Sequence, residues 1–405
     1  KKKTAAAAAA AAAAVKRRSV PPVAECRAEG HGARTIRYRN STRALWYQDG
    51  CKQWQLTGTW QKRPDRRIFY AFPFGGELEI LHMALEEIYP EVDVILLLEG
   101  KVTWRGEPKP LVFPRFNTTY AKYWDKIRYV PYGFEDPVMS DRLSRCMTEV
   151  VAGPHGSGPV ACRWLRQWGA RDHLLKISTD LAPNDVFIIA DLDELLARQF
   201  LRALKHCDVW PEGSPDPNTC SRMGIHTFGH KYTFSCTIAK NFGHFHPDLA
   251  LGRCAHRYGG EEIRREWGKP KRYNPRPRPF NLQKAKYIGP AGWHMHSFLS
   301  NAQVLWKWFS RSGSDLNSMR KWSQGDLDNI KSRRRECNED RLFFSFDALA
   351  CEPLPHLAIE NPEKWAHLIR YTDDTARPDE FGVEGWYREK LLQKRDGAES
   401  GQPDW

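Results

Sequence analysis

Three carboxylates follow a short apolar run in the middle of the chain. Residues 186–190 form a continuous apolar segment, which is typical of a strand buried on both faces. Asp191, Asp193 and Glu194 come directly after it. Open α/β sheets bind ligands at the carboxyl ends of their strands, so this position suits a binding site. In an extended chain Asp191 and Asp193 would point the same way, because residues two apart share a face.

Two carboxylates that converge on one point repel each other unless a cation lies between them. Hard oxygen ligands suit Mg²⁺ or Mn²⁺, ions that proteins commonly share with substrate phosphates. The pattern therefore indicates a divalent-metal site at Asp191 and Asp193. The alternative is an acidic helix start, in which Asp193 or Glu194 caps a helix over residues 195–206.

The segments before these carboxylates follow an α/β pattern. Apolar runs predict strands over residues 68–74, 92–98 and 127–130, and helical spacing predicts helices over 77–89 and 161–177. This order predicts a doubly wound fold with a mostly parallel central sheet. Because no G-x-G-x-x-G or P-loop motif is present, a metal and side chains must hold the phosphates of any bound nucleotide.

The basic charge of the chain is confined to its beginning. The net charge is +13, but residues 1–67 alone hold 16 Lys and Arg against 4 Asp and Glu. The rest of the chain is therefore close to neutral. A nucleic-acid function would rest only on this arm, so we expect no nucleic-acid partner.

Cysteines and sequons favour the secretory pathway. The ten cysteines include no C-x-x-C pair, which argues against a zinc knuckle and fits disulfides, such as Cys26 with Cys51. Asn40 and Asn117 begin N-glycosylation sequons. No apolar run is long enough to span a bilayer, and the chain begins with Lys, so we expect a membrane anchor upstream of this sequence.

The chain divides by composition into four parts. Residues 1–24 are a basic and Ala-rich linker, 25–66 a small Cys-containing stem, 67–390 the main domain and 391–405 a disordered tail. Within the main domain, residues 221–310 are rich in histidine and aromatic residues with irregular spacing. Residues 289–298 predict a turn that brings an imidazole and an aromatic wall to a pocket.

Four collinear blocks resemble glycosyltransferase family 17, the family of the bisecting N-acetylglucosaminyltransferases. The resemblance covers roughly residues 67–344. The matching positions are Phe74, Glu77, Glu79, Glu99, Thr103, Gly106, Pro108, Pro110, Arg171, Asp172, the block 184–194 and the triplet 292–294. Gly75, Gly76, Leu196 and Ala197 depart from the family pattern, and residues 210–287 match poorly. The resemblance therefore predicts the chemistry of the sugar donor better than the identity of the acceptor.

The resemblance implies a GT-A-like, Rossmann-like fold with an irregular acceptor-side region. It implies metal-dependent, inverting transfer of GlcNAc from UDP-GlcNAc to a mannose of a glycoprotein N-glycan, by a Golgi enzyme. In this interpretation Asp191 and Asp193 hold Mn²⁺ or Mg²⁺, and His294 is a further ligand. Inversion needs a general base, for which Glu77, Glu194 and Asp340 are candidates.

Four residues are interpreted as donor-binding. Glu99 accepts from uracil or ribose, Arg171 offsets phosphate charge, Trp293 stacks on a sugar face, and Phe74 belongs to the same site. Arg171 could instead pair with a strand-end carboxylate, and Trp293 could belong to the core. Two other functions stay open: the same fold with another UDP-sugar or glycan acceptor, and a glycan-binding protein without turnover.

Overall fold

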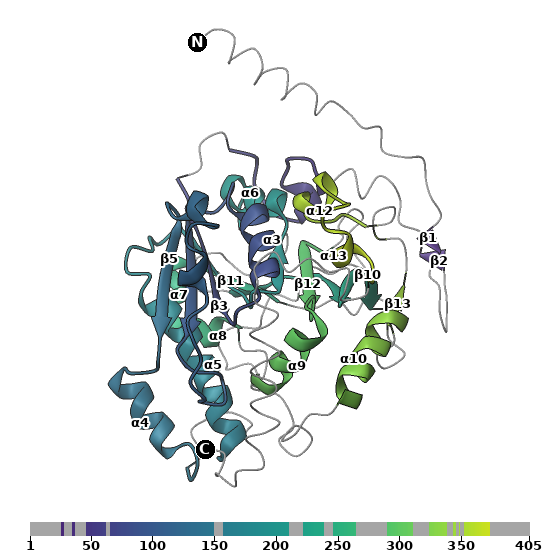
Figure 1. Ribbon diagram of the computed structural model, residues 1–405. Helices are drawn as coiled ribbons and strands as arrows, with labels where there is room; N and C mark the ends of the chain where they lie inside the picture. The colour runs from purple at the N-terminus through teal and green to yellow at the C-terminus, as the bar shows by residue number, and fades with distance from the viewer. Residues whose placement is uncertain are drawn as a thin grey trace.

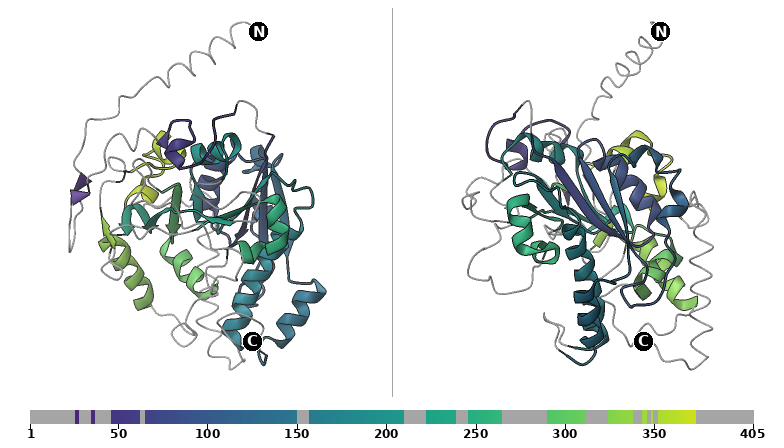
Figure 2. Two further views of the ribbon diagram at one scale, coloured as in Figure 1. Left: turned by 180° about the vertical axis from the view of Figure 1, so that it is seen from behind. Right: turned by 90° about the vertical axis from the view of Figure 1, so that its left-hand side faces the viewer.

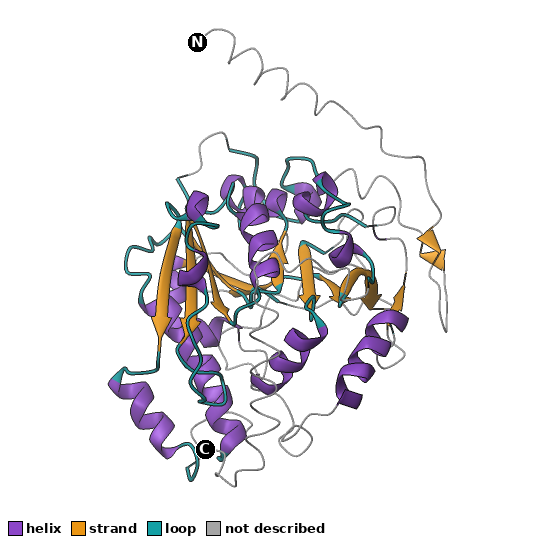
Figure 3. Ribbon diagram, in the orientation of Figure 1, coloured by secondary structure: helices purple, strands orange, loops and turns teal. Residues whose placement is uncertain are grey.

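The computed structural model describes residues 26–27, 35–36, 46–61, 65–149, 157–209, 222–238, 246–264, 290–310, 324–337, 343–345, 348 and 352–372. The predicted linker, the predicted tail and Asp340 lie outside these residues. In the described part, the strands form two sheets side by side with helices above and below them, and a separate two-stranded ribbon (Figure 3).

The larger sheet carries the predicted parallel strands. Its order is β5-β4-β3-β6-β11-β8, in which β3 to β6 run parallel and the last two strands are antiparallel to their neighbours. The strands are β3 (Ile68–Phe74), β4 (Val94–Gly100), β5 (Ile127–Tyr132), β6 (Val186–Ile189), β8 (Arg222–Gly224) and β11 (Asp248–Leu251). The four predicted strands are thus confirmed, with β4 shifted by two residues.

The chain reverses direction across this sheet at β3. From β3 it moves outward to β4 and β5, and then returns to place β6 on the other side of β3. Loops that leave β3 and β6 therefore diverge, which opens a crevice at the carboxyl ends of these two strands. Glu77 follows β3 and the acidic triplet follows β6, so the fold brings both groups to this crevice.

Helices cover both faces of the larger sheet (Figures 1 and 2). Alternate residues of each strand are buried on opposite faces; Tyr70 and Ile188 join one core cluster, whereas Phe69 and Phe187 join the other. The first cluster includes α3 (Leu78–Ile88) and α6 (Arg198–His206), and the second includes α5 (Pro159–Lys176), α7 (Gly252–Tyr258) and α8 (Gly260–Arg264). Both predicted helices, α3 and α5, are confirmed.

The smaller sheet corrects two sequence predictions. Its order is β13-β10-β9-β12-β7, formed by β7 (Glu194–Leu196), β9 (Phe228–Lys231), β10 (Thr233–Ile238), β12 (Gly292–His296) and β13 (Phe343–Ser345). The predicted helix over 195–206 begins only at Arg198, because Glu194–Leu196 pairs with β12 instead. The turn predicted within residues 289–298 is instead a strand, Gly292–His296, held between β7 and β9, which still brings the predicted imidazole of His294 to a pocket.

The remaining described elements complete the fold. They are β1 (Cys26–Arg27), β2 (Thr35–Ile36), η1 (Lys52–Trp54), η2 (Phe113–Phe116), η3 (Ala121–Tyr123), α4 (Pro137–Arg145), α9 (Asn301–Ser310), α10 (Gln324–Glu336), α12 (His356–Glu360) and α13 (Ala366–Ile369). Asp136 caps α4 by accepting a hydrogen bond from the backbone N–H of Met139. Across the described segments, no helix is both long and apolar enough to cross a membrane.

Disulfides join distant parts of the chain. Cys51 is bonded to Cys207, not to Cys26, so the predicted Cys26–Cys51 pair is wrong. Two further bridges are Cys146–Cys162 and Cys236–Cys337. Because Trp46 and Trp54 are buried in the main core and Cys51 is tied to the end of α6, residues 46–61 are part of the folded unit. The domain boundary predicted at residue 66 is therefore too late.

We expect the Cys51–Cys207 bridge to contribute more stability than the shorter Cys146–Cys162 bridge. The first closes a separation of 156 residues and the second one of 16, so the first restricts the unfolded chain more strongly. The entropic model gives about 5 kcal/mol for the first and about 3 kcal/mol for the second. Urea unfolding of C51A/C207A and C146A/C162A, without reductant, measures both. A smaller loss for C51A/C207A would contradict this expectation.

Candidate active site

A pocket of about 420 Å³ opens at the carboxyl ends of β3 and β6. We call it the switch-point pocket. Its walls come from the β3 end, the β4–η2 loop, α5, the segment after β6, β12 and α9. The lining side chains used below are Phe74, Glu77, Trp104, Lys109, Trp164, Asp191, Asp193, Glu194, Arg264, His294, His296 and Lys307.

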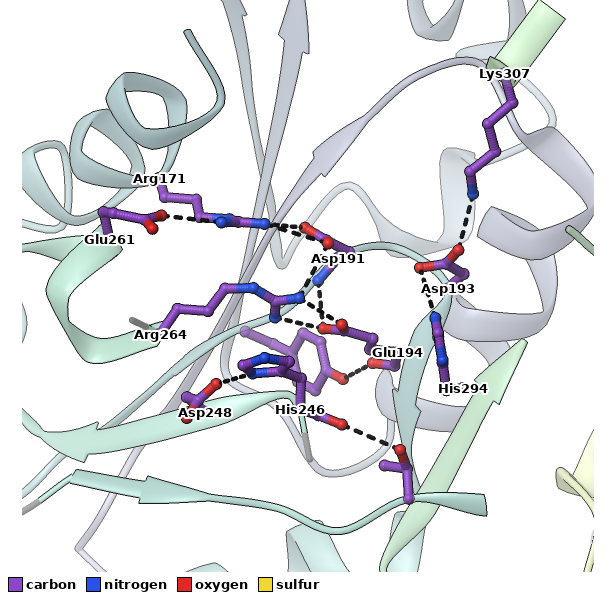
Figure 4. A network of polar contacts seen from close by, with 12 residues as sticks. Arg171, Asp191, Asp193, Glu194, His246, Asp248, Glu261, Arg264, His294 and Lys307 are labelled. Atoms are coloured by element: carbon purple, nitrogen blue, oxygen red, sulfur yellow. Dashed lines mark hydrogen bonds and ion pairs between the residues drawn. The ribbon is translucent and has the colours of Figure 1, made fainter. Parts of the chain in front are cut away.

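Asp191 and Glu194 are held from behind by two buried arginines (Figure 4). Arg171 Nη2 donates to Asp191 Oδ1 at 2.8 Å, and Arg171 Nη1 donates to Glu261 at 2.9 Å. Arg264 donates to both oxygens of Glu194 and, at 3.0 Å, to Asp191 Oδ2. Burial alone would lower the pKa of Arg264, but Asp191 and Glu194 outweigh it and raise this pKa well above its ordinary value.

Asp193 has different partners from Asp191. Its Oδ2 accepts a hydrogen bond of 2.8 Å from Lys307 Nζ, and its Oδ1 lies 3.9 Å from His294 Nε2. Figure 4 shows the two aspartates directed toward opposite sides of the loop. Burial would raise the pKa of Asp193, but the charges of Lys307 and His294 outweigh it and lower this pKa. The two aspartates thus pair with different cations, whereas the sequence predicts that they share one metal ion.

His294 lies in the pocket because of strand alternation in β12. Trp293 and Met295 are buried, whereas His294 and His296 line the pocket on the opposite face. Trp293 is 1% exposed, donates to the carbonyl of Pro353 and contacts Trp46. It therefore belongs to the core, which corrects its interpretation as a sugar-stacking residue.

Glu99 and Arg171 also have structural partners. The buried Glu99 carboxylate accepts from the backbone N–H groups of Val112 and Phe113, from Tyr129 and from Lys109. It fixes the loop after β4 instead of contacting a nucleoside as predicted. Arg171 was predicted either to offset phosphate charge or to pair with a strand-end carboxylate. It pairs with Asp191 and Glu261, so the second prediction describes it.

Glu77 and Phe74 lie in the pocket as the sequence predicts, at the end of β3. The Glu77 side chain is 18% exposed, and its Oε2 accepts a hydrogen bond from the backbone N–H of Gly75. Glu194 is only 1% exposed at its side chain, and Arg264 engages both of its oxygens. Of the candidate bases within the described residues, Glu77 is therefore the one with access to a substrate.

A family comparison covers the part of the chain that carries Glu77 and the acidic triplet. Residues 48–214 match the profile of Glycosyltransferase family 17. This segment belongs to glycosyltransferase family 17. It contains Phe74, Glu77 and the acidic triplet, whereas Arg264, His294 and Lys307 lie beyond its end.

Curated relatives match the family 17 segment over a limited length. The rat and human proteins named "Beta-1,4-mannosyl-glycoprotein 4-beta-N-acetylglucosaminyltransferase" are each 30% identical over 149 residues. The match covers 36% of this chain and 25% of each relative. The chain thus spans about a quarter of the length of these relatives.

Two solved glycosyltransferases share only a distant likeness with the chain. Mouse Xyloside xylosyltransferase 1 has a TM-score of 0.24 at 9% identity, covering 49% of this chain and 70% of its own. The glycosyltransferase GlyE of Streptococcus pneumoniae has a TM-score of 0.21 at 11% identity, covering 49% of this chain and 37% of its own.

Sequence reasoning missed Arg264, Lys307 and the tryptophans of the pocket. Arg264 lies in the poorly matching block, and Lys307 is not one of the positions that match the family pattern. No local motif marks either residue, because each pairs with carboxylates of the family 17 segment that lie at least 70 residues away in the sequence. Trp104 and Trp164 come from separate elements and meet only in the folded pocket.

We expect Arg264→Met to destabilise the protein strongly. It would leave the buried Glu194 without its cation, a loss worth about 3 to 5 kcal/mol, whereas Asp191 would keep its pair with Arg171. The measurement is the urea midpoint, with Arg145→Met as control, because Arg145 pairs with Asp141 and Glu149 at the exposed surface. Equal midpoints for the two variants would contradict the buried clamp.

Proposed function

We propose that the protein is a metal-dependent, inverting glycosyltransferase with a GT-A-like fold. It moves GlcNAc from UDP-GlcNAc to a mannose of a glycoprotein N-glycan, in a β-1,4 linkage of the bisecting type. The observation that carries the proposal is the place of the family 17 carboxylates. Glu77 and Asp193 face one pocket at the point where the strand order reverses, which is where such sheets bind nucleotides.

The donor set of the pocket fits a divalent cation only in part. Asp193 Oδ1 and His294 Nε2 lie 3.9 Å apart, and carboxylate oxygen and imidazole nitrogen both suit Mn²⁺. No group of three protein ligands occurs among the described residues. Asp193 and His294 would therefore hold the ion together with the donor, as is usual for metals shared with phosphates. A bound cation would neutralise the leaving diphosphate.

Glu77 is the proposed general base. The acceptor hydroxyl oxygen forms a bond to the anomeric carbon of GlcNAc, on the face opposite the diphosphate. The bond from that carbon to the phosphate oxygen breaks, and UDP leaves with the electron pair. The hydroxyl proton passes to the Glu77 carboxylate, which lies in the pocket and is partly open to it.

Aromatic side chains support a sugar substrate. Trp104 on the loop after β4 and Trp164 on α5 both line the pocket and are partly exposed. Partly exposed indole rings suit the apolar faces of pyranose rings, and such amphipathic contacts are common in binding sites.

We also propose residence in the Golgi lumen. The disulfides support an oxidising compartment. Asn117, the start of one sequon, is exposed and so accessible to glycosylation.

We expect Glu77→Gln to lower kcat by about 10² to 10⁴-fold, as loss of a general base does, while donor binding is retained. The assay combines the chain with UDP-GlcNAc, Mn²⁺ and a biantennary N-glycan, and follows UDP release and the product linkage. Asp141→Asn is the control, because Asp141 is an exposed carboxylate on α4 away from the pocket. An E77Q variant with wild-type kcat would remove Glu77 from the mechanism.

The same assay separates the other two functions. Transfer from a different UDP-sugar, or to a different glycan, would keep the fold and change the substrate. Glycan binding without UDP release from any nucleotide sugar would instead indicate a protein that binds glycans without turnover.

A further inference from the structure

Lys307 is a charged group of the switch-point pocket to which the proposed mechanism gives no role. It lies on α9, beyond the family 17 segment, and its side chain reaches the carboxylates from the side away from the arginines (Figure 4). Its Nζ is 2.8 Å from Asp193 Oδ2 and 3.6 Å from Glu77 Oε1. One ammonium group therefore pairs with both the proposed metal ligand and the proposed base.

Among the described residues, three cationic side chains line the pocket, and they differ in how exposed they are. The Lys109 and Arg264 side chains are 8% and 7% exposed, and their nitrogens bond to buried Glu99 and Glu194. The Lys307 side chain is 24% exposed. It also has a flexible four-carbon stem, so its ammonium group can change partners within the pocket.

A nucleotide diphosphate that enters this pocket meets four carboxylates: Glu77, Asp191, Asp193 and Glu194. The arginine clamp already neutralises Asp191 and Glu194 from behind. The remaining repulsion comes from Asp193 and Glu77, the two groups that Lys307 contacts. Lysine is a common phosphate ligand and acts as a point charge, so it can bind a carboxylate or a phosphate in turn.

We propose that Lys307 binds the donor diphosphate. While the pocket is empty, the Lys307 ammonium group is paired with Asp193 and Glu77 instead. This inference rests on the proposed function, since it requires a nucleotide-diphosphate donor. When Lys307 turns to the diphosphate, Asp193 Oδ2 loses its ammonium partner and becomes available to a cation. Glu77 loses the same partner and becomes available to the acceptor proton. Donor binding thereby prepares both carboxylates in one movement.

The test measures UDP binding to the full chain by calorimetry, in EDTA and in Mn²⁺. We expect Lys307→Met to weaken UDP binding at least tenfold, and Lys307→Arg to restore part of the loss. Lys205→Met is the matched control, because Lys205 Nζ is also 2.8 Å from a carboxylate, Asp93, and its side chain is 17% exposed. Lys205 lies on α6 and does not line the pocket, so K205M should bind UDP as the wild type does.

A second readout uses Mn²⁺ alone, with free ion followed by electron paramagnetic resonance. Removing the ammonium group from Asp193 should make K307M bind Mn²⁺ about tenfold more tightly than the wild type. Wild-type affinities of K307M for both UDP and Mn²⁺ would overturn the proposal and leave Lys307 as a structural counter-ion. Failure of the wild-type chain itself to bind any nucleoside diphosphate would overturn the proposed function, and the role of Lys307 with it.

Discussion

Carboxylates at the end of β6 pair with buried arginines, and this pairing joins three separate parts of the chain. Asp191 and Glu194 follow β6, Arg171 lies on α5, and Glu261 and Arg264 lie on α8. A buried charge without its partner costs several kcal/mol, so these elements can dock only where every charge is paired. The clamp thus fixes α5 and α8 against the sheet and holds the loop that carries Asp193.

The pairing of β7 with β12 sets the other half of the site. Glu194 lies opposite His294 in the register, and the backbone N–H of Met295 donates to the carbonyl of Asp193 at 2.7 Å. This brings the carboxylate and the imidazole to the same wall of the pocket. The two-residue alternation of β12 then separates roles along the strand, with Trp293 in the core and His294 at the surface of the pocket.

The site therefore combines fixed and adjustable charges. The clamped carboxylates are held by several bonds each, whereas Lys307 reaches the pocket on a long, partly exposed stem. The fixed groups lie mainly in the family 17 segment, while Arg264, His294 and Lys307 come from the part of the chain beyond it.

The sequence by itself determined the elements whose patterns are local. Apolar runs predicted strands β3 to β6, helical spacing predicted α3 and α5, and the end of β6 placed the acidic triplet at the ligand-binding edge of the sheet. Glu77 was a candidate through the family resemblance. Only the tertiary structure decided where each carboxylate points. Asp191 and Asp193 diverge because their cations come from α5, α8 and α9, and Glu194 joins a strand because β12 lies beside it. Such partners are distant in the sequence, so no spacing near residue 191 encodes them. Glu99, Arg171 and Trp293 likewise match the family pattern but have structural roles, because their partners were set by the fold.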